Sequence, residues 1–158
     1  MKVVAHALLI GLATFPASAL TLTGPAHVID GATISIGDAT IRLWGIDSFD
    51  ADQTCRKPDE AHWPCGKLAR MALTVLTKDQ TLNCADKGQD SFGRAMATCA
   101  IAGGSDLGSM MVNLGYAIDW PESGGFYQYE QEIARTARRG VWAGTFDLPW
   151  DWRRQHGR

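Results

Sequence analysis

The sequence predicts an α+β fold with a mainly β core, in which five short strands form a small barrel accompanied by about three helices. Between residues 28 and 50, apolar and polar side chains alternate in short runs that Gly and Asp turns separate, as is typical of β-hairpins. Apolar residues at helical spacing appear only after residue 64. Because the helices do not alternate with every strand, the order favours a barrel with inserted helices over a parallel α/β sheet.

The expected strands are joined by tight turns. Asp30-Gly31 and Gly37-Asp38 separate the first three strands, and a turn over residues 86–93 separates the last two. Residues 116–120 form one more extended segment. The five strands are expected at residues 28–29, 33–36, 40–44, 81–85 and 95–101.

Three helices are expected from the spacing of apolar residues, at 65–78, 105–114 and 127–139. Ser105 is the expected N-cap of the second helix, and Ile133 and Ala137 are expected to point inward from the third. The inward face of the first helix is expected to carry Leu68, Met71, Ala72, Val75 and Leu76.

Residues 1–19 have the pattern of a signal peptide: a Lys near the start, a mostly apolar stretch and the small residues Ala17-Ser18-Ala19. Cleavage is expected before Leu20, although a retained N-terminal anchor is the alternative. The apolar stretch is shorter than the roughly 20 residues of a membrane span. Residues 20–158 then form a single domain with a C-terminal tail, long enough for a hydrophobic core and with no stable membrane insertion after cleavage.

The formal net charge of −2 does not indicate general attraction to nucleic acid. Any such attraction must therefore be local. The candidates are Arg42, Arg94 and the group Arg135, Arg138 and Arg139, of which the last is better explained as the solvated face of a helix.

Four cysteines follow the predicted signal peptide, and no two of them form a Cys-x-x-Cys pair, which makes a zinc site improbable. An even number of cysteines in an exported protein indicates disulfides. Three pairings are possible. We favour Cys55–Cys65, which closes a short loop, with Cys84–Cys99, which a hairpin would place side by side.

Charged residues gather around the third strand. Asp30, Asp47 and Asp50 lie at or near strand ends, and Arg42 lies within the strand. Carboxylates beside a cation could bind a metal and a phosphate. The alternative is ordinary, since Asp is common in turns and an Arg on a strand usually faces solvent.

Three motifs resemble the staphylococcal-nuclease-like (thermonuclease) family over roughly residues 26–142. They are I-D-G-A-T at 29–33, I-R-L-W-G-I-D-S-F-D at 41–50 and F-G-R at 92–94. The resemblance implies a five-stranded barrel of the OB type, which commonly binds oligonucleotides or oligosaccharides. Its order of strands and helices agrees with the order expected from the sequence.

The resemblance also implies a site for phosphodiester hydrolysis with one calcium ion. It implies that Arg42 binds the phosphate, Arg94 stabilises the transition state and Asp50 orients the attacking water. The implied metal residues are Asp47 as a carboxylate ligand, Ser48 through its carbonyl and Asp30 in the outer shell.

Four positions depart from the family pattern. Ala32 stands where the family has a calcium-binding Asp, and a methyl group cannot ligate calcium, which prefers six to eight oxygens. Asp50 replaces a Glu, which shortens the side chain by one bond. Phe49 replaces a Pro, and Phe92 replaces a Tyr and so removes a hydroxyl group.

The sequence therefore leaves two functions open. The first is an exported, calcium-assisted and weakened nuclease that acts on DNA or RNA as a monomer in the periplasm or the medium. The second is an impaired nuclease-like module that binds nucleic acid or another polyanion, or that serves the cell envelope or exopolysaccharide production. Ala32 is the feature that separates the two functions.

Overall fold

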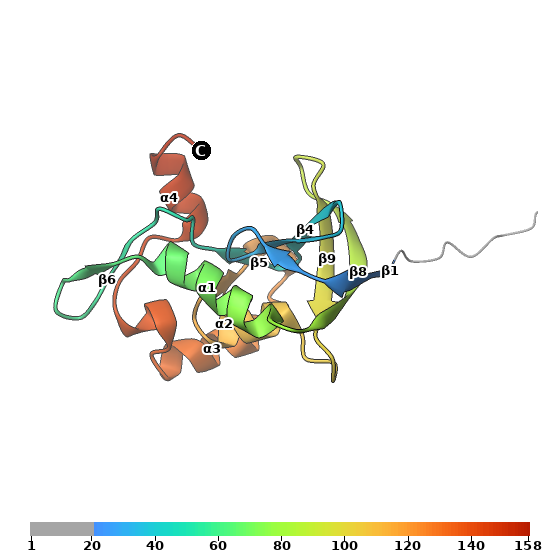
Figure 1. Ribbon diagram of the computed structural model, residues 1–158. Helices are drawn as coiled ribbons and strands as arrows, with labels where there is room; N and C mark the ends of the chain where they lie inside the picture. The colour runs from blue at the N-terminus through green and yellow to red at the C-terminus, as the bar shows by residue number, and fades with distance from the viewer. Residues whose placement is uncertain (1–20) are drawn as a thin grey trace, which may run out of the picture.

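The computed structural model describes residues 21–158. The predicted signal peptide, residues 1–19, and the predicted cleavage site before Leu20 lie outside the described residues. The mixed α+β fold agrees with the prediction, and its sheet curls as an OB-type half-barrel (Figure 1).

The main sheet within residues 21–158 has six strands in the order β1-β8-β9-β4-β3-β2. Neighbouring strands are antiparallel except β4 and β9, which run parallel. The sequence predicted every strand of this sheet except β1, which pairs with β8 at one edge. The strands are β1 (Thr21–Pro25), β2 (His27–Val28), β3 (Thr33–Ile36), β4 (Ala39–Leu43), β8 (Thr81–Gln89) and β9 (Ala95–Ala100).

Two short strand pairs lie outside this sheet. β5 (Ile46–Ser48) pairs with β10 (Ala117–Asp119), so that Asp47 lies opposite Ile118. β6 (Cys55–Arg56) pairs with β7 (His62–Trp63) inside the segment 50–64, where the sequence predicted only an irregular loop.

Four α-helices and two 3-10 helices occur in the described part of the chain. Figure 1 shows α1, α2 and α3 grouped beside the curled sheet, while α4 projects separately near the C-terminus. They are α1 (Cys65–Thr77), α2 (Leu107–Asn113), η1 (Pro121–Ser123), α3 (Gln128–Thr136), η2 (Gly140–Ala143) and α4 (Pro149–Gln155). None of the helices within residues 21–158 is long and apolar enough to cross a membrane.

The predicted inward face of α1 is only partly correct, since Ala72 and Leu76 pack against the core but the most buried row of the helix is a different one. Met71 and Val75 are 59% and 72% exposed, whereas the helix buries the row that contains Ala69 and Leu73. This row includes the small residue Gly66, where an added Cβ would lie 1.7 Å from the carbonyl oxygen of Asp50. The helix therefore turns its small residues toward the domain, because they allow the backbone of the Asp50 turn to come close.

Three predicted helix details also need correction. The N-cap of α2 is Asp106, whose carboxylate accepts the Ser109 N–H at 2.8 Å, and not Ser105. Helix α3 ends at Thr136, and Ala137 is exposed, because Arg138 adopts a positive φ of 52° that breaks the helix. The fourth helix, α4, was not predicted, and the sequence indicated only a C-terminal tail there.

The core fills the space between the curled sheet and the helices. Its largest fully buried aliphatic side chains include Ile34 and Leu43 from the sheet and Leu73, Leu107 and Met111 from the helices. The predicted disulfide pairing is confirmed: Cys84 and Cys99 lie opposite each other on β8 and β9, and Cys55 bonds to Cys65 at the start of α1.

Candidate functional site

A cleft of about 1060 Å³ opens between the sheet, the loop that joins β8 to β9, and α4. In Figure 1, this loop and α4 project from the same side of the molecule, on either side of β4 and β5. The structure brings together all six residues that the sequence indicated for catalysis or metal binding. The cleft is lined by Asp30, Arg42, Asp47, Ser48, Asp50 and Arg94, with Ala32 also in its wall.

The two predicted arginines reach the cleft from β4 and from the loop residue just before the parallel strand β9. Arg42 on β4 lies opposite Met96 on β9, and Arg94 precedes Met96 by two residues. Both arginines line the cleft, Arg42 from the sheet and Arg94 from the loop that joins β8 to β9.

Asp47 is the most enclosed acidic residue of the cleft, with a side chain that is only 1% exposed. One carboxylate oxygen accepts hydrogen bonds from the Arg42 guanidinium at 2.5 Å and from the Ser48 N–H at 3.0 Å. The other oxygen accepts a hydrogen bond from Arg153. Two ion pairs therefore satisfy this buried carboxylate from both sides.

Arg153 on α4 is the main site residue that the sequence did not indicate. Its guanidinium donates through Nη2 to Asp47 and through Nη1 to Asp50, the latter at 2.9 Å. Burial lowers the pKa of Arg153, but the hydrogen bonds and charges of Asp47 and Asp50 outweigh burial and raise it. Arg153 therefore stays charged and bridges the two carboxylates.

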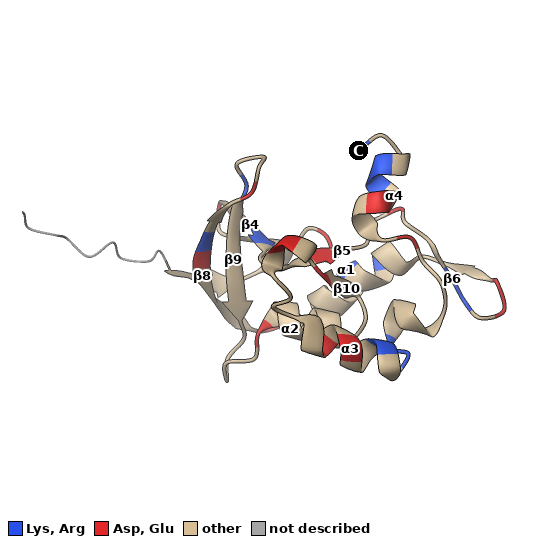
Figure 2. Cartoon of the chain, turned by 180° about the vertical axis from the view of Figure 1, so that it is seen from behind, with Lys and Arg blue, Asp and Glu red and all other residues tan. Residues whose placement is uncertain are grey.

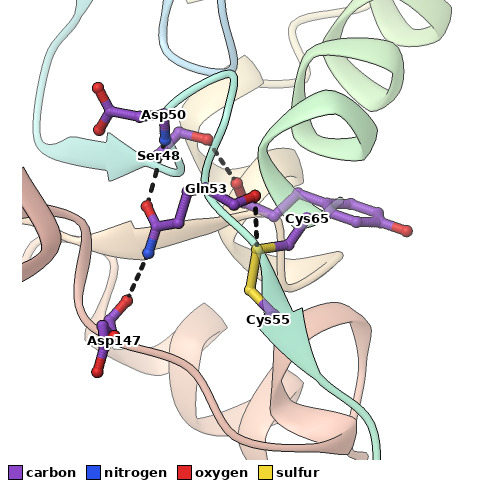
Figure 3. Close-up of a disulfide and its surroundings, with 7 residues drawn as sticks. Ser48, Asp50, Gln53, Cys55, Cys65 and Asp147 are labelled. Carbon is purple, nitrogen blue, oxygen red and sulfur yellow. Dashed lines mark hydrogen bonds between the residues drawn. A yellow bond between two sulfur atoms is a disulfide. The ribbon is translucent and has the colours of Figure 1, made fainter. Parts of the chain in front are cut away.

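The turn that carries Asp50 is held by Gln53, a second residue that the sequence did not indicate. The Gln53 side chain is fully buried. Its oxygen accepts the Asp50 N–H at 3.3 Å, and its amide nitrogen donates to the Asp147 carbonyl at 2.8 Å (Figure 3). The Gln53 carbonyl faces Cys65 of the adjacent disulfide. Gln53 thus ties the Asp50 turn to the segment that leads into α4.

Asp30 and Ala32 form the next part of the wall. One oxygen of Asp30 accepts the Ala32 N–H at 2.8 Å, which forms a tight local turn. Ala32 is only 2% exposed, and its methyl group stands in the cleft wall in place of the calcium-binding Asp that the resemblance implies. Asp30 has one carboxylate oxygen without a hydrogen bond to any residue in the described range.

The loop between β8 and β9 presents Arg94 at the opposite rim. Asp90 accepts the N–H groups of Phe92 and Arg94, each at 2.9 Å, and pairs with the Arg94 guanidinium at 2.6 Å. Desolvation raises the pKa of Asp90, but these hydrogen bonds outweigh it and hold the pKa below its usual value. Phe92 is 82% exposed, with its ring 5.3 Å from the Arg94 guanidinium carbon.

The cleft lining carries acidic and basic residues together, with six acidic side chains against four arginines. Figure 2 shows basic and acidic segments together on α4 and an acidic segment beside β5. Every lining arginine in the described chain has an acidic partner: Arg42 with Asp47, Arg94 with Asp90, Arg153 with Asp47 and Asp50, and Arg158 with Asp52. By contrast, Arg135 pairs with Glu132 on the exposed face of α3, away from the cleft.

The carboxylates do not fit a calcium ion while Arg153 remains in place. Both oxygens of Asp47 and one of Asp50 accept guanidinium N–H groups, and Ala32 contributes no ligand. Within residues 21–158, no three His, Cys, Asp or Glu side chains are grouped closely enough to hold a metal ion. Calcium at this site thus stays a prediction, and it would require Arg153 to move away.

Comparison with known proteins agrees with the resemblance in the motifs. Residues 40–144 match the family model described as "Staphylococcal nuclease homologue". The chain is also 32% identical over 123 residues to the succinoglycan biosynthesis protein ExoI of Rhizobium meliloti (strain 1021). This alignment covers 77% of the chain and 64% of the relative, so the chain spans a little under two thirds of the relative's length.

Proposed function

We propose that this chain, which belongs to the staphylococcal nuclease homologue family, is an exported phosphodiesterase that binds DNA or RNA in its cleft and hydrolyses it slowly. The observation that carries the proposal is that Arg42, Arg94 and Asp50 line the same cleft. Guanidinium groups suit phosphate because they donate two parallel hydrogen bonds to its oxygens.

Arg42 is the stronger anchor of the two. It is 18% exposed at the side chain, and its only hydrogen bond within the described residues uses one Nη2 N–H. Its other N–H groups are available to a phosphate oxygen in the cleft. Arg94 is 46% exposed on a loop and can stabilise charge that develops on the phosphate during cleavage.

Asp50 is the candidate group for the attacking water. One of its oxygens accepts from Arg153, and the other has no hydrogen-bond partner among residues 21–158. This second oxygen can accept a proton from water at the edge of the cleft. Because Arg153 occupies one of the two oxygens, only the other can contact the attacking water, and we expect slow turnover.

Export is supported by the chemistry of the cysteines. All four are paired in two disulfides, which are typical of oxidising compartments outside the cytoplasm. Together with the predicted signal peptide, this favours an enzyme in the periplasm or the medium.

The test is release of acid-soluble nucleotides from denatured DNA and from RNA by purified residues 20–158, with calcium and with EDTA. We expect slow release by the unaltered protein and a loss of about 100-fold or more in Arg42→Ala, the usual cost of removing a donor to developing charge. Arg42→Lys should rescue poorly, because it cannot donate two parallel bonds. Arg135→Ala is the control and should remain active. Equal rates in Arg42→Ala and the unaltered protein would overturn the proposal.

A second candidate function is a part in exopolysaccharide biosynthesis. It is favoured by the similarity to a relative that is named for succinoglycan biosynthesis. Trp44 and Trp120 line the cleft, and aromatic rings can stack on sugars as well as on bases. Calorimetric titration with an acidic, phosphate-free oligosaccharide would distinguish the two. Binding that survives Arg42→Ala would favour the polysaccharide function over the phosphodiesterase.

A further inference from the structure

We infer that Arg153 takes the place of a divalent cation in this cleft, so that the site binds phosphodiesters without a metal ion. The inference rests on the proposed function. It adds that the positive charge beside the two carboxylates comes from Arg153 and not from a metal ion. It follows from the hydrogen bonds of Arg153 to both Asp47 and Asp50.

The first step concerns charge. Asp47 and Asp50 together carry two negative charges at the point where a phosphate must approach Arg42. Without compensation they would repel the phosphate, because the interior of the cleft screens charges less than water does. Arg153 and Arg42 bring two positive charges to the same two carboxylates, which removes the repulsion.

The second step concerns geometry. A planar guanidinium can donate hydrogen bonds to two carboxylates at once. A metal ion between the same carboxylates would be ligated by one oxygen from each. Arg153 does this with its two terminal nitrogens. An ion between Asp47 and Asp50 and the guanidinium of Arg153 would therefore need the same oxygen atoms. Only one of the two can be bound at a time.

The third step concerns how Arg153 is held. Helix α4 is fixed by the buried Trp152, by the bond from Gln53 to Asp147 and by the pair of Arg158 with Asp52, in which both terminal nitrogens donate. These contacts lie on both sides of Arg153 in the sequence. The guanidinium is thus positioned before any ligand arrives, which reduces the ordering cost of binding.

The variant that tests this inference is Arg153→Gln, because it removes the charge and keeps a polar side chain of similar length. The matched control is Arg154→Gln, since Arg154 lies next on α4 and pairs with Asp151 outside the cleft lining. Calcium binding is measured by calorimetry, and binding of an oligothymidylate is measured by fluorescence anisotropy in EDTA and in calcium.

The unaltered protein and Arg154→Gln should bind no calcium at millimolar concentration and should bind the oligothymidylate equally in EDTA and in calcium. Arg153→Gln should bind calcium at least about 10-fold more tightly than the unaltered protein. Its affinity for the oligothymidylate should fall about 10-fold or more in EDTA and recover in calcium.

Calcium binding by the unaltered protein at millimolar concentration would overturn the inference. Because this titration of the unaltered protein needs no variant to fold, it decides the point alone, and Arg153→Lys serves as a milder second variant with intermediate calcium affinity. If the oligothymidylate binds none of the proteins, the proposed function fails, while the calcium titrations still decide whether Arg153 occupies the cation position.

Discussion

The side-chain amide of Gln53 donates a hydrogen bond of 2.8 Å to the carbonyl of Asp147, 94 residues later in the chain. Gln53 is fully buried, and the same side chain accepts the N–H of Asp50. This one residue therefore sets the position of an acidic turn relative to the helix that carries Arg153.

Replacing Gln53 by Leu should destabilise the protein and disturb the cleft. The change removes both hydrogen bonds of the buried Gln53 side chain, each of which contributes about 0.5–1.5 kcal/mol. The free energy of unfolding, measured by denaturant titration, should fall by an amount of this order of magnitude. Gln155→Leu is the matched control, because Gln155 is exposed on α4, and it should change stability by less than about 0.5 kcal/mol. Equal stability of the two variants would contradict the assigned role of Gln53.

Tyr127 should make the protein sensitive to alkali. Its ring is 3% exposed, and its hydroxyl donates to Asp106 at 2.8 Å. Burial first, and then the negative charges of Asp106, Glu130 and Asp119, raise the pKa of Tyr127. A raised pKa in the folded state means that the stabilising effect is complete below the unfolded pKa of about 10 and is lost as the pH rises above it.

The free energy of unfolding should therefore fall between about pH 10 and pH 12. In Tyr127→Phe the fall should be smaller, although the variant loses about 0.5–1.5 kcal/mol at neutral pH with its hydrogen bond. Tyr129→Phe is the control, since Tyr129 is 76% exposed, and its curve should follow that of the unaltered protein. If the free energy of unfolding falls equally with rising pH in Tyr127→Phe and in the unaltered protein, Tyr127 does not cause the effect.

Ala32→Asp should make stability respond to calcium. The new carboxylate would lie in the cleft wall that also contains Asp47, where Ala32 is now 2% exposed. Without a counter-charge, the new carboxylate should destabilise the folded protein. A bound calcium ion should restore the lost stability, because it binds the folded state and not the unfolded state. Melting temperatures measured with calcium and with EDTA should differ in Ala32→Asp and should differ more in Ala32→Asp combined with Arg153→Gln.

The unaltered protein should melt at the same temperature under both conditions. Ala32→Ser is a suitable control, because it adds a polar group without a charge. A calcium response of the unaltered protein that equals that of the double variant would mean that the site already holds calcium without these changes.

Much of the fold could be predicted because its signals are local. The alternation around Gly37-Asp38 indicated β3 and β4, and the turn ending at Gly93 indicated the hairpin that aligns Cys84 with Cys99. The inward face of α1 could not be predicted from hydrophobicity, because the helix buries the small residues Gly66 and Ala69 and leaves Val75 in solvent.

The site was only partly predictable, for a related reason. Arg42, Asp47 and Asp50 lie within nine residues of one another in a recognisable motif. Arg153 lies 106 residues from Asp47, in a short tail helix whose sequence carries no motif. Long-range ion pairs of this kind depend on where the C-terminal helix packs on the domain. The spacing of nearby residues does not encode that position.

The central claim, that Arg42 and Arg94 bind phosphates in this cleft, is tested most directly by the salt dependence of oligothymidylate binding. A single-stranded ligand loses affinity with salt at a slope of about −0.7 per phosphate contact, so two contacts predict a slope of about −1.4. Arg42→Ala and Arg94→Ala should each reduce it to about −0.7, while Arg135→Ala should leave it unchanged. A slope that neither cleft variant alters would contradict the account.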